Sequence, residues 1–301
     1  MRRPEAAAPV EDRTLRAILL MLGALLAFTG IDTCAKWLVQ HGVPATQVAF
    51  VRYAVHFLIV LGIGFATGAR VWVTENLGAV SLRAVTLLAS TLLNFMAVFY
   101  LPLTMTSALM FSAPLWICLL SIPILGEQVG PRRWAALLMG FAGILIVARP
   151  WGGDLHWAVL LSLGAALAGA LYAILTRRLA GRDGIHTQQF YVGLVSTLGV
   201  APFALAAWTW PQGAGNWLAL ALIGGFGWIG HQLLTLAHRF APASTLAPFT
   251  YVQIVYMTAS SWLIFAQPPD RYVLLGAGVA AASGLYIWLR ERALARRGGK
   301  G

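Results

Sequence analysis

This sequence contains little charge. Only 10% of its 301 residues are charged, whereas a soluble domain carries about 25%. Hydrophobic residues make up 59% of the chain and form continuous runs. Continuous runs exclude a transmembrane β-barrel, whose strands alternate polar and apolar residues. The composition therefore predicts an all-α integral membrane protein, with room for about ten spans.

Cysteines and chemical motifs are also scarce. Cys34 and Cys118 both lie in apolar runs, so they indicate neither a disulfide nor a metal site. No phosphate-binding glycine loop is present, which argues against direct use of ATP. Asp32 is the only acidic residue well inside a predicted span, since Glu291 lies at the very end of the last one. A membrane-embedded enzyme would need a cluster of catalytic groups. We therefore expect no cofactor, no metal and no enzymatic activity.

The apolar runs predict ten transmembrane helices. A run of roughly 20 apolar residues crosses the ~30 Å hydrocarbon layer of a membrane. The first run is long and lacks a clear cleavage site, so we expect a retained helix rather than a signal peptide. The predicted spans are residues 16–39, 46–67, 78–100, 104–124, 132–149, 156–179, 186–209, 216–238, 243–265 and 271–292.

Basic residues gather on one side of these spans. The net charge is +11, from 21 basic and 10 acidic residues. Seventeen basic residues lie in the two tails or in every second connection, if Arg83 is counted with the connection that follows the second span. Only Arg149 and Arg271 belong to the other side. Because cytoplasmic loops carry the excess of Lys and Arg, both termini are predicted to be cytoplasmic, and the charge requires no nucleic-acid partner.

The two halves of the chain resemble each other. Residues 23–38 align without a gap with residues 164–179, at an offset of 141. The same offset pairs Thr46-Gln47 with Thr187-Gln188. Chance similarity between apolar segments is the alternative to a true repeat. We interpret the match as a repeat because small residues and the Thr-Gln pair coincide.

Five spans in each half make the second half inverted in the membrane. Inverted repeats are a recurrent architecture of transporters, with the substrate site near the midplane between the halves. We therefore predict a cytoplasmic tail (1–15), a first five-helix repeat (16–149), an inverted second repeat (156–292) and a second cytoplasmic tail (293–301).

The stretch 106–147 carries a family resemblance. An apolar run that contains Pro114 stops at Gly126-Glu127, and Pro131 opens a second, glycine-rich apolar run. This pattern resembles the signature of the EamA family of the drug/metabolite transporter superfamily. The resemblance implies a ten-helix exporter of amino acids, including aromatic ones, or of related metabolites and drugs, in the bacterial inner membrane. An importer, or a carrier of a vitamin or a nucleotide sugar, is the alternative.

Three charged residues within the spans form a candidate gating or ion network. Asp32 and Lys36 are four residues apart and share a helix face. Arg52 enters the second span to the same depth as Asp32, ~10 Å below the surface. Charges in a membrane usually pair or face water, so we predict an Asp32–Arg52 pair that is either a structural clamp or a gate, with Lys36 reaching outward. Lys36 and Arg52-Tyr53 resemble family positions, which leaves their role open.

Polar and aromatic residues near the span midpoints are the candidate substrate contacts. Asn94 and His231 occupy equivalent positions at an offset of 137. They either join helices by hydrogen bonds or face the substrate from two sides of a cavity. Aromatic residues in the spans either pack or stack on the substrate. The predicted substrate-binding residues are Asn94, Ser112, Trp116, Tyr172, Trp228, His231, Tyr251 and Gln253.

Prolines and glycines mark candidate hinges. Pro114 and Pro248 lie at corresponding places in the fourth and ninth spans. A proline frees backbone carbonyls, so each is either a structural kink or part of a cavity wall. Gly227 and Gly230 in the eighth span permit bending, although close helix packing is the simpler explanation.

Glu127 is predicted to form a salt bridge or a helix cap, and Gln267 replaces the acid in the second half. Glycines in the fifth and tenth spans favour packing within one chain. We therefore expect a monomer, with a weak dimer as the alternative. The expected partners are a small-molecule substrate and the lipid bilayer.

Overall fold

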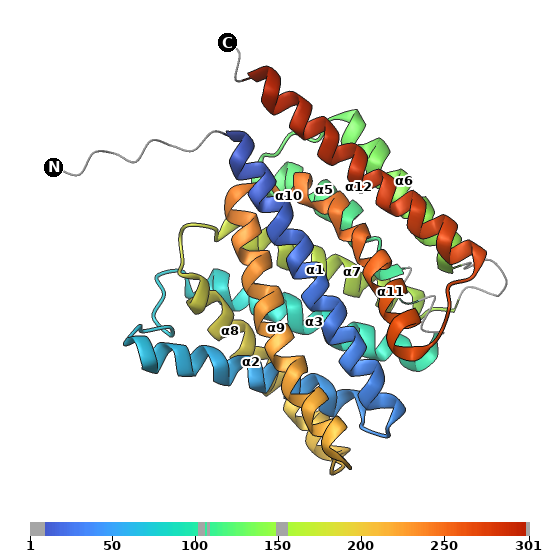
Figure 1. Cartoon of the computed structure of the whole chain (residues 1–301). Coiled ribbons are helices and arrows are strands. Elements are labelled where there is room, and N and C mark those ends of the chain that lie inside the picture. Colours follow the sequence, from blue (N-terminus) through green and yellow to red (C-terminus); the bar gives the residue numbers. More distant parts are fainter. Residues whose placement is uncertain (1–9, 102–105, 107–108, 149–155, 299–301) are drawn as a thin grey trace.

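The computed structural model describes residues 10–101, 106, 109–148 and 156–298, and within them it contains helices and no strand. Figure 1 shows that α1 begins and α12 ends at the same end of the bundle. The elements are α1 (Val10–Gln40), α2 (Ala45–Thr67), α3 (Leu77–Tyr100), α5 (Ala113–Leu125), α6 (Pro131–Ala148), α7 (Val159–Arg178), α8 (Ile185–Ala206), α9 (Ala214–Phe240), α10 (Ala243–Leu246), the 3₁₀ helix η1 (Ala247–Val252), α11 (Gln253–Phe265) and α12 (Arg271–Gly298).

Helix packing repeats between the two halves. α1 packs along α9, and α3 packs along α7. α7 is the second-half equivalent of α1, and α9 is the equivalent of α3. Exchanging the two halves therefore converts one of these pairs into the other. α2 packs against α8, and α6 lies beside α12 at one edge of the molecule (Figure 1), so each of these helices meets its own equivalent. A two-repeat architecture therefore fits the structure.

Helix ends repeat as well. α5 and α11 begin and end at an offset of 140, and each ends at a residue in the left-handed region: Gly126 (φ 68°) and Ala266 (φ 52°). Left-handed helix ends usually use glycine, which has no Cβ. Among the described residues, Ala266 is the only non-glycine residue with a positive φ. The second half thus keeps the same helix ending without the glycine.

Irregular backbone occurs at both candidate hinge prolines. The predicted span 104–124 is not one regular helix, because α5 begins only at Ala113, after a turn at residues 111–112, with Pro114 in its first turn. Residues 102–105, 107 and 108 of that span lie outside the described part. Span 243–265 divides into α10, η1 and α11, with Pro248 in the 3₁₀ piece. Proline interrupts the helix because it lacks the N–H donor and its ring collides with the preceding turn.

Six of the described helices are long and apolar enough to cross a membrane. They are α1, from Arg13 onward, α2, α3 to Asn94, α7, α8 and α9. α5 and α11 each have 13 residues, which is too short for a span on their own. The larger number of ten spans remains a prediction.

Arg83 corrects the sequence analysis. It was counted with the connection after the second span, but it lies inside α3 and its side chain is fully buried (0% exposed). Counting loops by charge assigns any arginine near a helix end to the surface, and this one points into the bundle. Without Arg83 the basic residues divide 16 to 2, so the orientation predicted from charge is unchanged.

Glycines let the central helices approach closely. A Cβ at Gly230 would lie 2.5 Å from the Phe28 ring, and one at Gly30 would lie 2.9 Å from the Phe226 ring. Glycine and phenylalanine therefore interlock in both directions between α1 and α9. Gly230, a candidate hinge, serves packing in this conformation.

The outer helix pair is joined in the same way. A Cβ at Gly143 would lie 2.7 Å from the carbonyl oxygen of Gly276. The glycines of α6 and α12 therefore pack within one chain, as the sequence predicted.

Adjacent glycines on α9 provide a matched test. A Cβ at Gly224 would lie 2.3 Å from the Val55 Cβ, whereas Gly225 has open space. We expect Gly224→Ala to lower the detergent melting temperature by several degrees, because overpacking costs about 1–3 kcal/mol. Gly225→Ala should be neutral or slightly stabilising, since alanine favours helix by about 1 kcal/mol. Equal melting temperatures for the two variants would contradict this packing.

Candidate functional site

A pocket of about 240 Å³ lies between α1, α2, α3 and α9. It uses the last third of α1, the first third of α2 and the second half of α3, so it occupies the half of the bundle that contains the α1–α2 turn. We call this half the pocket half. The lining residues are Ile31, Asp32, Ala35, Val39, Ala45, Val48, Ala49, Arg52, Ser90, Thr91, Asn94, Met110 and Ile223.

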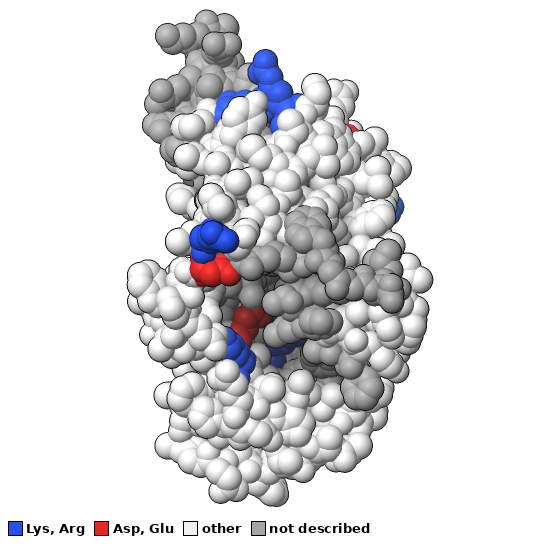
Figure 2. Space-filling view, turned by 90° about the vertical axis from the view of Figure 1, so that its right-hand side faces the viewer, with Lys and Arg blue, Asp and Glu red and all other residues white. Residues whose placement is uncertain are grey.

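The lining combines apolar walls with a few polar groups, as small-molecule sites do. Asp32, Arg52 and Asn94 supply a carboxylate, a guanidinium and an amide. Asn94 has no hydrogen-bond partner among the described residues. Figure 2 shows acidic and basic side chains gathered in a hollow of an otherwise largely uncharged side of the molecule.

The two charges in the pocket do not pair directly. Asp32 accepts a hydrogen bond from Gln253 Nε2 at 3.2 Å. The Arg52 guanidinium lies 4.2 Å from the centre of the Tyr53 ring, and within the described chain its buried Nε has no hydrogen-bond partner. The predicted Asp32–Arg52 ion pair is therefore absent from this conformation, because Arg52 lies along α2 towards Tyr53. Both charges remain available to a bound solute.

The candidate hinge Gly227 lies beside the stem of this arginine. A Cβ at Gly227 would lie 3.4 Å from Arg52 Cγ, which is an ordinary contact distance. Close packing on Arg52 therefore does not by itself require a glycine at this position.

Lys36 belongs to a different contact. Its Nζ donates to Gln267 Oε1 at 2.6 Å and lies 4.3 Å from the centre of the Phe265 ring. The i,i+4 spacing from Asp32 therefore does not produce one network of three charges. Lys36 instead holds α1 to the turn between α11 and α12.

Tyr172 and His231, both predicted substrate contacts, lie in a buried polar cluster. The Tyr172 hydroxyl is 2.8 Å from His231 Nδ1. Arg83 Nη2 donates to the same hydroxyl at 2.8 Å and to Thr235 Oγ1 at 3.2 Å. Arg83 Nε donates to Thr176 Oγ1 at 2.7 Å. We call this group, with Gln189, the Arg83 cluster.

Gln189 completes the cluster. Its Nε2 donates to Thr235 Oγ1 and to the His231 carbonyl oxygen, both at 2.9 Å. The cluster lies at the start of α3 and α8 and the end of α7 and α9, and therefore in the half opposite the pocket half.

The remaining predicted contacts lie outside the pocket. Tyr251 is fully buried, and its ring fills the space above Gly140. Trp116 packs against the core formed by α5, α6, α7 and α12. Trp228 packs beside Phe190. Ser112 donates its hydroxyl to the Leu109 carbonyl oxygen at 2.6 Å.

Sequence reasoning missed several residues of α3 that line the pocket or lie in the buried cluster. Ser90 and Thr91 line the pocket, and Arg83 anchors the buried cluster. Steps of seven and four residues separate Arg83, Ser90 and Asn94, which places them on one helix face. This helical spacing was the signal in the sequence that could have identified them.

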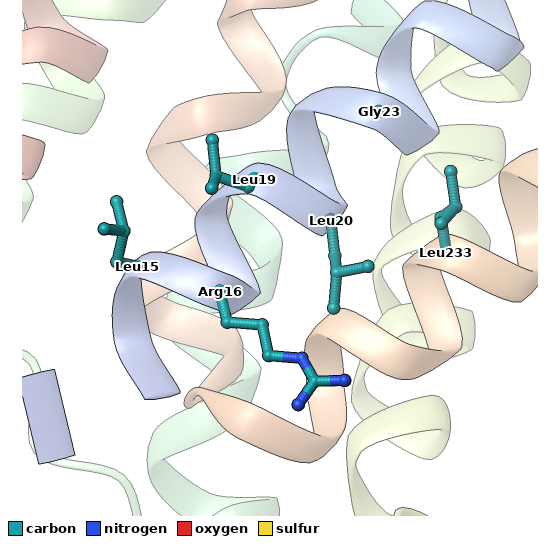
Figure 3. A pocket seen from close by; sticks show the side chains of 6 residues that line it. All are labelled: Leu15, Arg16, Leu19, Leu20, Gly23 and Leu233. Atoms are coloured by element: carbon teal, nitrogen blue, oxygen red, sulfur yellow. The ribbon is translucent and has the colours of Figure 1, made fainter. Parts of the chain in front are cut away.

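A second groove lies on the outer surface between α1 and α9. It measures about 380 Å³ and has one polar lining side chain, Arg16, which lies 4.6 Å from the centre of the Phe240 ring. Figure 3 shows the leucine side chains that form the rest of its wall. A solute site needs several convergent polar groups, so this groove is not the candidate site.

Comparison with known proteins identifies the family of this chain. Residues 15–149 and 156–289 match the EamA-like transporter family. The chain belongs to this family. The resemblance stated from Gly126-Glu127 and the glycine-rich helix that follows is therefore confirmed, and the protein is a membrane transporter of the drug/metabolite type.

Similar family members carry different solutes. A riboflavin transporter of Vibrio cholerae is 31% identical, over 96% of this chain and 98% of its own length. An S-adenosylmethionine uptake transporter of Rickettsia felis is 24% identical, over 91% and 93%. The pseudopaline exporter CntI of Pseudomonas aeruginosa is 26% identical, over 89% and 94%. Relatives named for uptake and for export are therefore both similar to this chain over most of its length.

A solved structure supports the fold alone. It is described as "Crystal structure of protein", superposes with a TM-score of 0.80 at 20% identity, and the match covers 93% of this chain and 98% of that one.

Proposed function

We propose that this transporter carries a small heteroaromatic solute of the riboflavin class through the pocket. The observation that supports it most directly is the set of polar groups that Asp32, Arg52 and Asn94 present together in a largely apolar wall. The similarity to the riboflavin transporter, which extends over nearly both full lengths, favours this class. It corresponds to the vitamin-carrier alternative of the sequence analysis, rather than to the preferred amino-acid export.

The chemistry of the pocket suits such a solute. One edge of a flavin ring presents two carbonyl oxygens with an N–H between them. A guanidinium donates to carbonyl oxygens, and a carboxylate accepts from an N–H. Arg52 and Asp32 supply one group of each kind, and Asn94 can act as donor or acceptor. Apolar residues such as Val48 and Ile223 would contact the ring faces.

Amino acids are the second candidate. A zwitterion carries an ammonium and a carboxylate, and Asp32 and Arg52 carry the opposite charges. This fit supports the amino-acid class that the sequence predicted, including aromatic members.

The membrane arrangement completes the proposal. Ten spans form two inverted repeats, 16–149 and 156–292, with both termini in the cytoplasm of a bacterium and the chain in its inner membrane. The pocket half then faces the periplasm. Transport proceeds by alternating access without ATP, and the transporting unit is a monomer.

Flux in reconstituted liposomes tests the function. We expect saturable movement of labelled riboflavin at least tenfold above protein-free liposomes, measured for entry and exit separately and with and without a pH gradient. A panel of labelled amino acids forms the second arm. Movement of amino acids without riboflavin would favour the second candidate, and movement of neither would overturn both.

A further inference from the structure

The Arg83 cluster occupies the place that the pocket would take if the two halves of the chain were exchanged. At the offset of 141 that relates α1 to α7, pocket-lining Ile31 and Ala35 correspond to Tyr172 and Thr176. Both counterparts hydrogen-bond Arg83. The residues with which α1 lines the pocket are thus equivalent to the residues that α7 contributes to the cluster.

The other helices repeat the correspondence. At 141, pocket-lining Val48 of α2 corresponds to Gln189 of α8, and at 137, Asn94 of α3 corresponds to His231 of α9. Gln189 and His231 are bonded to each other in the cluster. The two sites are therefore equivalent in the repeat and lie in opposite halves of the bundle.

One site is open and the other is closed. The side chains of Arg83, Thr176, Gln189 and Thr235 are all 0% exposed. The guanidinium of Arg83 fills the centre of the cluster, and all four of its hydrogen bonds go to neutral groups: three hydroxyls and the carbonyl oxygen of Gln188. No carboxylate of the described chain pairs with it. A buried charge without a counter-charge is costly, so its place in the membrane interior points to a role.

Unused hydrogen-bonding capacity surrounds this arginine. The side-chain oxygens of Gln188 and Gln189 are buried and, within the described chain, have no partner. The same holds for His56 Nε2, on a side chain only 1% exposed, whose ring centre lies 5.8 Å from that of His231. Buried polar atoms are normally satisfied, so this concentration indicates a site that binds polar groups in another conformation.

We infer that the Arg83 cluster is a second solute site, the closed counterpart of the pocket at the opposite end of the transport path. Inverted-repeat transporters alternate because each half can adopt the conformation of the other. When this half opens, Arg83 exchanges its bonds to Tyr172 and Thr176 for the carbonyl or carboxylate oxygens of the solute. Each end of the path thus has one arginine, Arg52 or Arg83, although both belong to the first repeat. The choice of solute rests on the proposed function, whereas the position of the site does not.

Thiol labelling tests the position without any solute. In a chain with Cys34→Ala and Cys118→Ala, Thr86→Cys probes the cluster, because Thr86 is the counterpart of pocket-lining Ile223 and bonds the Arg83 carbonyl oxygen. Ser283→Cys is the control, at a buried residue of α12 whose hydroxyl faces Gly140 of α6 rather than the pocket or the cluster. Exposed Arg182→Cys and Gln212→Cys, in the connections before α8 and α9, mark the two membrane faces.

We expect a membrane-impermeant thiol reagent to modify Thr86→Cys from the Arg182 face at least tenfold faster than Ser283→Cys. Equal rates for the two cysteines, or modification of Thr86→Cys only from the Gln212 face, would overturn the inference. Because no solute takes part, failure of the riboflavin assay leaves this result interpretable.

A second experiment separates binding from passage. Arg83→Gln should leave the dissociation constant of riboflavin in detergent within about threefold of the unchanged protein and lower flux at least tenfold. Arg83→Lys should restore most of that flux, because it restores the charge. A purely structural Arg83 would instead give equal losses in binding, flux and melting temperature for both variants, and that pattern would refute the assignment.

Discussion

Replacing Arg52 with glutamine should lower solute flux by about ten- to a hundredfold. A hydrogen bond from a charged group contributes about 1.5–3 kcal/mol, and each 1.4 kcal/mol is about tenfold in affinity. Arg52 lines the pocket and makes no hydrogen bond within the described chain, so its removal leaves no hydrogen-bond partner unsatisfied. The folded yield should therefore stay near normal, which makes flux the sensitive measurement.

The partner charge sharpens this test. Asp32→Asn should also lower flux, because Asp32 lines the same pocket. If both residues hold one solute, the double variant should lose less than the sum of the two single losses. Exposed Arg70→Gln is the charge-matched control and should leave flux unchanged. Full flux in Arg52→Gln, or strictly additive losses, would show that the two charges do not act on one bound molecule.

Much of the fold could be predicted from the sequence, because the membrane imposes strong rules. Low charge and continuous apolar runs predicted transmembrane helices. The offset of 141 predicted a repeat, and the packing of the helices fits it. Pro114 and Pro248 marked the irregular backbone in each half. The exact pieces of the ninth span could not be predicted, because a 3₁₀ segment depends on how its surroundings satisfy the backbone.

The lining of the candidate pocket was predicted only in part. Asp32, Arg52 and Asn94 were found because polar groups are rare and costly within a membrane. Tyr251 was assigned to the substrate site for the same reason, yet it packs on Gly140, since an aromatic ring at a span midpoint fits a core equally well. Arg83 was missed because charge counting reads an arginine near a helix end as a surface residue.

Glu127 shows how the two halves are joined. Its two carboxylate oxygens accept hydrogen bonds from the backbone N–H groups of Ala243 and Ser244, each at 2.9 Å. A carboxylate at the first N–H groups of a helix satisfies donors that have no partner within the helix. The predicted cap is therefore confirmed, and it connects the α5–α6 turn of the first half to α10 of the second.

The second half uses the equivalent residue differently. Gln267 accepts from Lys36 and from the Ser261 hydroxyl, at 2.6 and 3.2 Å. The amide oxygen of Gln267 thus joins α1 to the α11–α12 turn, whereas Glu127 caps α10.

Glu127→Ala should consequently be among the most destabilising single substitutions outside the core. It leaves the N–H groups of Ala243 and Ser244 without acceptors, in residues 1% and 0% exposed. Each unsatisfied buried donor costs about 1–3 kcal/mol, so we expect the detergent melting temperature to fall by about 5 °C or more. Glu127→Gln keeps one acceptor oxygen, so its melting temperature should lie between those of Glu127→Ala and the unchanged protein. Exposed Glu75→Ala, which removes an acid that bonds nothing in the described chain, should leave the melting temperature unchanged. If Glu127→Ala and Glu75→Ala had the same melting temperature, the cap would contribute little to stability. Another contact would then have to hold α10 to the first half.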